Sequence, residues 1–222
     1  MPSAYARAAL LAKELGFTGV QVHAAHGFLL SQFLSPLFNH RQDEYGGSID
    51  RRFSVIGEII SAIRIAVGPA FPIGIKINST DMLEGGLTTQ EALRVIELLE
   101  DTSGDLIDVS GGTYFPGAAS SSDAASSSGP YFTEFAKKAK QKTSIPIVLT
   151  GGFRTKEQAL SAIQEGAADA IGLARSMVLN PALPNAWLSN EDADLQFPTF
   201  DAPPRGGVTA WYSMRLTALG ED

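Results

Sequence analysis

Helical and strand-like patterns of apolar residues alternate along most of this chain of 222 residues. Apolar and small residues recur at helical spacing in five segments, at 4–15, 49–67, 89–101, 131–142 and 155–165. Short apolar runs, which are typical of buried strands, lie between and after these segments, at 19–25, 72–78, 105–110, 145–150 and 170–174. Strands that alternate with helices in this way predict an α/β fold around a parallel sheet that is covered on both faces.

The predicted strands share a second feature, because each of them ends in polar or glycine-rich residues. These residues are His23, Lys76, Ser110, Gly151 and Arg175. In a (β/α) barrel the active site lies at the carboxyl ends of the strands. A doubly wound sheet binds its ligands at the same ends, so it remains the alternative to the barrel that we prefer.

One long segment interrupts the alternation of helices and strands. Residues 112–130 follow the third predicted strand and are rich in Ser, Ala and Gly. Long segments without secondary structure are often functional loops, so we expect a mobile loop over the mouth of the site. An insertion that has no role is the alternative interpretation.

The C-terminal part of the chain departs from the pattern again. Residues 198–207 are rich in Pro and Gly, and they lead to a last predicted helix at 208–219. Three apolar residues of this helix are expected to pack on the exterior of the barrel: Trp211, Met214 and Leu219. We therefore divide the chain into a partial barrel over residues 1–190 and a linker with a short helix over 191–222.

Composition and charge narrow the class of protein. The chain has 24 acidic and 17 basic residues, a net charge of −7, whereas a nucleic-acid-binding protein needs a basic face. It contains no cysteine, which excludes disulfides, thiolate metal sites and a cysteine nucleophile. No apolar run reaches the roughly 18 residues of a membrane span, and the first residues do not resemble a secretory signal. We expect a cytoplasmic protein without nucleic-acid or membrane partners.

The first candidates for chemistry are His23 and His26, which lie in the sequence His-Ala-Ala-His-Gly at the end of a predicted strand. A spacing of three at a strand-to-loop bend would aim both imidazoles into one pocket, where they would polarise a carbonyl or an anionic oxygen. Two histidines also suit a metal, but no third ligand of a suitable type is near, so no metal is expected. The spacing equally allows two histidines that are held by hydrogen bonds within the loop.

Lys76 lies in an otherwise apolar strand. Because burying its charge is costly, this lysine requires a negative or electron-rich partner. One such partner is a bound flavin, whose pyrimidine edge gains negative charge on reduction. The other is a carboxylate on a neighbouring strand, such as Asp108, in a salt bridge. The pattern leaves both interpretations open.

Two glycine-containing segments follow consecutive short strands, and a helix begins after each. Glycine lets a phosphate approach the backbone closely, and a helix N-terminus supplies N–H donors. Phosphate sites of (β/α) barrels are commonly built from the loops after strands seven and eight. Phosphate binding is therefore preferred, and glycines that serve only tight turns are the alternative. The candidate residues are Gly151, Gly152, Phe153, Gly172 and Arg175.

These candidates fall in segments that resemble a known family. The long segment HAAHGFLLSQFLSPLFNHRQDEYGGSIDRR at 23–52 is similar to the Old Yellow Enzyme family of NADH:flavin oxidoreductases. Four later segments are similar to the same family: GIKIN at 74–78, DVSGGTY at 108–114, LTGGF at 149–153 and GLARSMVLNP at 172–181. The resemblance extends from about residue 4 to residue 181, which is most of the chain.

The resemblance implies an FMN-binding (β/α)₈ barrel of the TIM type. Such an enzyme takes hydride from NADH or NADPH and passes it from flavin N5 to an activated alkene, such as an α,β-unsaturated carbonyl. His23 and His26 would hold the carbonyl oxygen, and Lys76 would lie near the N1 and O2 edge of the flavin. The five residues of the two glycine-containing segments would hold the FMN phosphate.

Two departures from the family pattern change what we expect. The family usually has a tyrosine that protonates the alkene at the position of Phe28, and a phenyl ring has no proton to give. The proton would then come from water, Tyr114 or another group, unless the reaction is not alkene reduction. We expect Phe28 and Tyr114 to line the substrate site. The chain also begins in what resembles the helix before strand four, so an incomplete barrel with strands four to eight is expected.

An incomplete barrel has two sheet edges with unpaired backbone groups and exposed apolar faces. We expect a partner chain or a second copy of this chain to cover them. Two alternative functions follow from the departures. One is a flavin-free isomerase or cyclase that polarises a carbonyl with His23 and His26, and the other is an accessory chain without catalysis.

Overall fold

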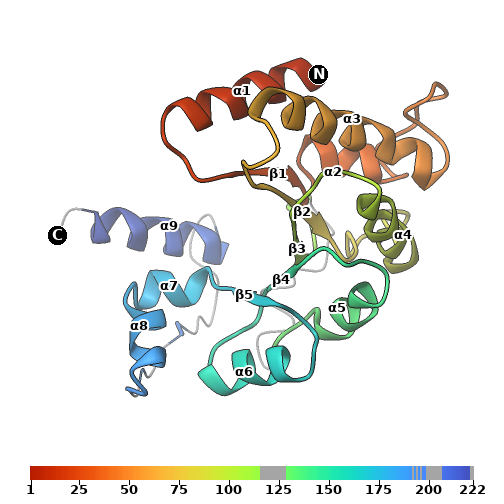
Figure 1. Ribbon diagram of the computed structural model, residues 1–222. Coiled ribbons are helices and arrows are strands. Elements are labelled where there is room, and N and C mark those ends of the chain that lie inside the picture. Colours follow the sequence, from red (N-terminus) through yellow and green to blue (C-terminus); the bar gives the residue numbers. More distant parts are fainter. Residues whose placement is uncertain (116–128, 192, 194, 196, 199–206, 221–222) are drawn as a thin grey trace.

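The computed structural model describes residues 1–115, 129–191, 193, 195, 197–198 and 207–220 (Figure 1). Its strands are β1 (Val20–Ala24), β2 (Ile73–Asn78), β3 (Leu106–Ser110), β4 (Ile147–Thr150) and β5 (Ala170–Gly172). All four strand pairs are parallel, and the order in the sheet, β1-β2-β3-β4-β5, is the order in the chain. A doubly wound sheet reverses its strand order at the ligand site, whereas a barrel does not. The prediction of an incomplete (β/α) barrel is confirmed.

Helices connect the strands and lie outside the sheet. The predicted helices are confirmed as α1 (Pro2–Glu14), α3 (Ile49–Val67), α4 (Thr89–Glu100), α5 (Thr133–Lys140) and α6 (Lys156–Gln164). In Figure 1, α3, α4, α5 and α6 follow one another around the outside of the strands. The helix expected after the second glycine-containing segment is α7 (Arg175–Leu179), whereas two short helices were not predicted: α2 (Leu29–Leu34) and α8 (Leu183–Leu188). Segments of five or six residues are too short to show a helical period.

The core lies between the sheet and the surrounding helices. Ile73, Ile75 and Ile77 share one face of β2, and all three are buried in this core. Helix α3 contributes the isoleucines on its inner face to the same cluster. Because alternate residues of a strand point to opposite faces, the remaining residues of β2 face the interior of the barrel.

That interior face carries polar side chains. His23, Lys76 and Asp108 are register partners on β1, β2 and β3, so they form one row across the sheet. Gln21, two residues before His23, lies on the same face, and both side chains are exposed. Within the described residues, no strand pairs with the outer edge of β1 or of β5, so this row is open to solvent on the β1 side.

Helix α4 begins with a reciprocal cap. The Thr88 hydroxyl accepts a hydrogen bond from the Glu91 N–H at 3.2 Å, and the Glu91 carboxylate accepts one from the Thr88 N–H at 3.1 Å. These two bonds satisfy two backbone donors that the helix itself leaves unpaired. The cap fixes the start of the helix that covers β2 and β3.

Replacing Thr88 by Ala should lower the free energy of unfolding by about 1 kcal/mol, because one of these donors loses its acceptor. The matched control is Thr89→Ala, one residue later, where the exposed side chain makes no capping bond. Urea denaturation would measure both variants. Equal stability of the two variants would contradict the role of the cap.

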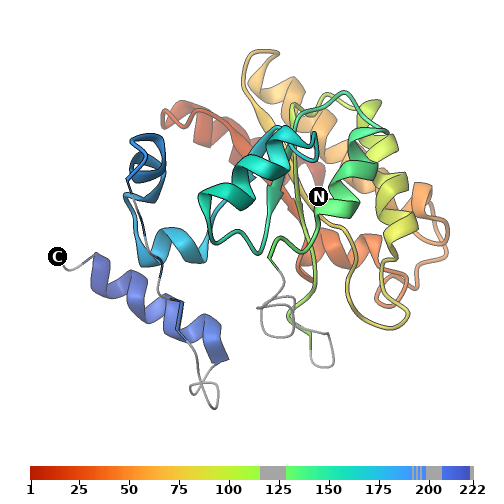
Figure 2. The same ribbon diagram turned by 90° about the horizontal axis from the view of Figure 1, so that it is seen from below.

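The C-terminal helix α9 (Gly207–Leu219) lies next to α7, at the end of the molecule away from α3 and α4 (Figure 2). Its buried residue is Tyr212, whereas Met214 is 59% exposed. The prediction that Met214 packs on the barrel was therefore wrong, while Trp211 and Leu219 are half-buried. The residues of α9 are apolar on several sides, so the sequence did not show which face is covered.

Two further expectations fall largely on residues that the structure does not describe. The loop predicted at 112–130 includes residues 116–128, and the linker predicted at 198–207 includes residues 199–206; both stretches lie outside the described residues. Among the helices that are described, none has the length and apolar character that crossing a bilayer requires.

Candidate active site

A sharp turn after β1 brings the two histidines together. His26 and Gly27 both have left-handed backbone conformations, with φ of 60° and 79°. Outside glycine this conformation is strained and is often found at functional sites. The turn is held by the His26 N–H, which donates to Asn78 Oδ1 at 3.1 Å. The His23 and His26 rings lie 5.3 Å apart, centroid to centroid, so both reach one site at the carboxyl end of the sheet.

The two histidines differ in their hydrogen bonds. The His26 Nε2 lies 2.9 Å from the Ser110 hydroxyl on β3, and the His26 carbonyl accepts from the Tyr114 N–H at 3.4 Å. His26 is thus held by hydrogen bonds, but its ring and its backbone N–H are bonded to residues of neighbouring strands rather than within the loop. His23 is exposed, and within the described residues its ring makes no hydrogen bond. The ring N–H of His23 is therefore more accessible to a ligand than the ring N–H of His26.

Burial lowers the pKa of both imidazoles, and the nearby positive charge of Lys76 lowers them further. The pKa of His26 falls to about 4, with His23 as an additional cause, while the negative charge of Asp108 opposes the shift at both rings. The His26 ring is therefore neutral near pH 7. A neutral imidazole has one N–H donor, which suits it to hold a carbonyl oxygen.

The lowered pKa of His26 predicts a pH dependence of stability. Between its ordinary pKa of 6.5 and about 4, the unfolded chain binds a proton at His26 that the folded chain does not. The free energy of unfolding should therefore fall as the pH is lowered through this window, by roughly 3 kcal/mol in all and by roughly 2 kcal/mol between pH 7 and pH 5. Urea denaturation at pH 7 and pH 5 would measure it. In a His26→Asn variant the loss between these pH values should be smaller, and an equal loss would contradict the assignment.

Two aromatic side chains complete the surroundings of the histidines. The Phe28 ring lies 5.0 Å from the His23 ring, and the Tyr114 ring lies 6.0 Å from the His26 ring. Phe28 and Tyr114 are themselves 5.9 Å apart, centroid to centroid, so the four rings form a closed group. Phe28 is 51% and Tyr114 70% exposed. The structure thus offers an accessible aromatic surface beside two N–H donors, which suits a flat unsaturated ligand.

The mostly buried Lys76 has a carboxylate partner. Its Nζ lies 2.6 Å from Asp108 Oδ2 on the neighbouring strand, with 15% and 11% of the two side chains exposed. The salt bridge, one of the two interpretations of this lysine, is confirmed. A paired ammonium group still faces the interior of the barrel beside His23, so the ion pair does not exclude a ligand there.

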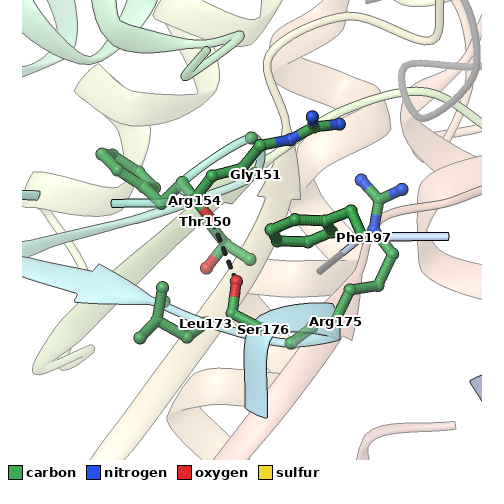
Figure 3. A pocket seen from close by; sticks show the side chains of 11 residues that line it. Thr150, Gly151, Arg154, Leu173, Arg175, Ser176 and Phe197 are labelled. Carbon is green, nitrogen blue, oxygen red and sulfur yellow. Dashed lines mark hydrogen bonds between the residues drawn. The ribbon is translucent and has the colours of Figure 1, made fainter. Parts of the chain in front are cut away.

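A small pocket of about 50 Å³ lies where β4 and β5 end. All five residues that the sequence indicated for phosphate binding line it. The described residues that line it are Thr150, Gly151, Gly152, Phe153, Arg154, Gly172, Leu173, Ala174, Arg175, Ser176 and Phe197 (Figure 3). The Ser176 hydroxyl donates to the Phe153 carbonyl at 3.0 Å and so ties the two segments together.

Close contacts within the protein itself explain why two positions of this pocket are glycines. Gly152 has a φ of 84°, and a Cβ there would overlap the Gly129 carbonyl oxygen. A Cβ on Gly172 would overlap the hydroxyl of Thr150. Contacts within the protein therefore account for these two glycines, and the glycines alone do not identify a ligand.

The charges of the pocket do indicate a ligand. Two of its lining residues are arginines, Arg154 and Arg175, and none is acidic. Both are half-buried, and in the described part of the chain neither forms an ion pair with a carboxylate. Both side chains extend toward the Phe197 ring (Figure 3), over which the Arg154 guanidinium lies at 4.6 Å from the centroid. Two partly desolvated cations without counter-charges favour an anion, and the size suits a phosphate group.

Sequence reasoning missed Arg154 and Phe197. Arg154 directly follows the Gly-Gly-Phe segment, so its position was a usable signal. Phe197 comes from a segment of irregular structure far along the chain, and nothing in the local pattern connects it with β4 or β5. Only the tertiary structure brings its ring to the pocket.

Comparison with known proteins identifies the family of this chain. The model of the NADH:flavin oxidoreductase / NADH oxidase family matches residues 2–191. The chain belongs to this family. The resemblance to Old Yellow Enzyme is thereby confirmed, and FMN with a nicotinamide reductant is the cofactor set of the family.

Two relatives illustrate the similarity in sequence. The chain is 40% identical over 222 residues to the NADH-dependent flavin oxidoreductase iliE of Hypocrea jecorina, covering 93% of this chain and 55% of that protein. It is 35% identical over 176 residues to the NADPH dehydrogenase of Geobacillus thermodenitrificans, covering 79% of this chain and 49% of that protein. The chain thus spans about half the length of these relatives.

Two solved structures show the similarity in fold. A 2-naphthoyl-CoA reductase in complex with 2-naphthoyl-CoA matches with a TM-score of 0.80 and 30% identity, covering 86% of this chain and 29% of the other. Morphinone reductase in complex with tetrahydroNAD matches with a TM-score of 0.69 and 25% identity, covering 89% of this chain and 50% of the other. The five-stranded sheet therefore corresponds to part of a larger barrel.

Proposed function

We propose that this chain provides the FMN phosphate site and the carbonyl-binding histidines of an NAD(P)H-dependent reductase of activated alkenes. The observation that carries the proposal is the pocket with Arg154 and Arg175, which form no ion pair with a carboxylate among the described residues, at the same end of the sheet as the histidine pair. An anion site and a carbonyl site at one end of a parallel sheet are what a flavin nucleotide and an unsaturated carbonyl together require.

The size and position of the pocket support FMN with its phosphate at β4 and β5. A pocket of about 50 Å³ has room for the phosphate but not for the flavin ring. The ring would then lie over the open interior face of β1 to β3, where Lys76 and His23 form part of one row. Bound there, FMN would supply the hydride-transfer chemistry that no side chain of this chain provides.

The histidine pair supports a carbonyl-containing substrate. Neutral His23 and His26 would each donate one N–H to the carbonyl oxygen of an α,β-unsaturated ketone or aldehyde. Withdrawing electrons through that oxygen makes the β-carbon a better hydride acceptor, and negative charge then develops where the two donors point. Phe28 and Tyr114 would cover the flat faces of the substrate and exclude water from it.

The proton for the α-carbon requires a separate donor, because Phe28 has none. Tyr114 is the phenol of the aromatic group, and it is exposed enough to exchange its proton with water. Water or Tyr114 would therefore complete the reduction. The choice between them does not change the class of substrate that we propose.

The open sheet edges support a requirement for further polypeptide. The side chains of Leu11, Leu15 and Phe17, at the end of α1 and in the segment that leads to β1, are apolar and exposed. Unpaired edges and apolar surface of this kind are covered in stable proteins. Additional strands, from the same polypeptide, a second copy or another chain, would pair with β1 and close the barrel around the flavin.

Phe28 favours a second candidate function. An apolar ring in contact with His23, where alkene reduction would use a proton donor, suits a reaction that polarises a carbonyl without adding hydrogen. A flavin-free isomerase or cyclase would need only the histidine pair. An accessory chain without catalysis would need neither site.

The first experiment is a visible absorption spectrum of the purified chain with and without added FMN. A bound-flavin spectrum that bleaches anaerobically with NADPH or NADH, and recovers on addition of an enone, is the expected result. Colourless protein that FMN does not stabilise thermally would contradict the proposal for this chain. Conversion of an enone isomer by colourless protein would support the isomerase instead.

A further inference from the structure

Three side chains from three different strands converge on the carboxylate of Asp108, which lies on β3. The Lys76 ammonium group lies 2.6 Å from Oδ2, and the Gln21 amide donates to the same oxygen at 3.3 Å. The Thr150 hydroxyl donates to the other oxygen, Oδ1, at 2.8 Å. Asp108 is buried, so water competes little for these bonds and they hold the groups in one arrangement.

The position of this carboxylate connects the two parts of the proposed flavin site. Thr150 is at the end of β4 and lines the pocket that holds the two arginines. Lys76 lies on the other side, in the row that continues to His23. A single buried carboxylate therefore fixes one side chain at the phosphate end and one at the histidine end of the same face.

The charges of Lys76 and Asp108 both act on this face. Lys76 lowers the pKa of His23 and of His26, and Asp108 raises both. A group at the site thus experiences the positive charge of the ammonium group after partial cancellation by the carboxylate. Negative charge that develops over this row would therefore be stabilised less than it would be by a lysine without a carboxylate partner.

We propose that Asp108 is a positioning residue that holds the Lys76 ammonium group at the flavin site and partly cancels its charge, and so lowers the reduction potential of the bound flavin. The inference rests on the proposed function. Reduced flavin carries more negative charge than oxidised flavin, so a nearby cation raises the potential and a carboxylate that neutralises the cation lowers it.

The test is a double-mutant cycle that measures the midpoint potential of bound FMN. Asp108→Asn keeps the size and shape of the side chain and one of its two oxygen acceptors, but removes the negative charge. It should raise the affinity for reduced relative to oxidised FMN at least tenfold, which corresponds to about 30 mV for a two-electron couple. In a Lys76→Met background, the same substitution should change this ratio less than threefold.

Two results would overturn the proposal. An unchanged or lower potential in Asp108→Asn would show that the carboxylate does not moderate the charge. Equal changes with and without Lys76 would show that it acts directly on the flavin rather than through the lysine. The matched control is Asp101→Asn, the same change at an exposed position after α4, which should leave the potential unaltered.

A measurement on the flavin-free chain separates this inference from the proposed function. The protons on Lys76 Nζ should exchange with water at least tenfold faster in Asp108→Asn than in the natural chain, as followed by NMR of the labelled ammonium group. Equal exchange rates would overturn the positioning role whether or not FMN binds. A natural chain that binds no FMN would overturn the proposed function and the effect on potential, while the exchange rates would still decide whether Asp108 holds Lys76.

Discussion

FMN should bind about 100-fold more weakly after Arg175 is replaced by Met. A charge-assisted hydrogen bond from a guanidinium group to a phosphate is among the stronger bonds that a protein makes, and Arg175 lines the anion pocket without an acidic partner among the described residues. Methionine keeps much of the side-chain length but removes every donor. Arg154 would remain as the single cation, so binding should be weakened rather than abolished.

Fluorescence titration of free FMN would measure the Kd of the Arg175→Met variant. Arg7→Met is the matched control, because Arg7 is exposed on α1, the helix that precedes β1 at the opposite edge of the sheet from β5. The control should bind FMN as the natural chain does. A Kd for Arg175→Met within threefold of the natural value would place the phosphate elsewhere. Weaker binding at higher phosphate concentration in the natural chain would further support an anion pocket.

Replacing His23 by Ala should lower kcat/KM for an enone about 100-fold while leaving flavin reduction by NADPH unchanged. Removing one preorganised donor from a site where negative charge develops typically costs this much or more. His23 is the more informative of the two histidines, since its exposed ring is not needed to hold the turn, whereas His26 is bonded to neighbouring strands. The variant should therefore fold like the natural chain.

Stopped-flow spectroscopy would separate the two half-reactions of this variant. The reductive half, in which NADPH bleaches the flavin, should be unaffected, and the oxidative half with the enone should slow. His40→Ala, the same change in an exposed loop outside the site, should leave both halves unaltered. A slower reductive half with an unaltered oxidative half would reverse the assignment and place His23 in nicotinamide binding.

The secondary structure followed closely from the sequence because local periodicity determines it. The predicted helix at 49–67 has these bounds in the structure. The failures were also local in origin. The helix α2 has only six residues, and α9 has apolar residues on several sides, so Met214 was expected to pack on the exterior of the barrel when it is exposed.

The sequence by itself determined the candidates at the carboxyl ends of the strands. The alternation of helices and strands requires those ends to lie at one edge of a parallel sheet, and polar residues there have few structural reasons to exist. The pair His23 and His26, the lysine in an apolar strand and the glycine-containing segments were all visible in this way. Their resemblance to one family, which the match over residues 2–191 bears out, gave them a common interpretation.

Only the tertiary structure decided which groups meet. The strand order separated a barrel from a doubly wound sheet, and the register placed Asp108 beside Lys76. The pocket gained Arg154 and Phe197, and the glycines proved to be required by the packing of the protein itself. Contacts between residues distant in the chain depend on how strands and helices assemble, and no local pattern of apolar and polar residues specifies those distances.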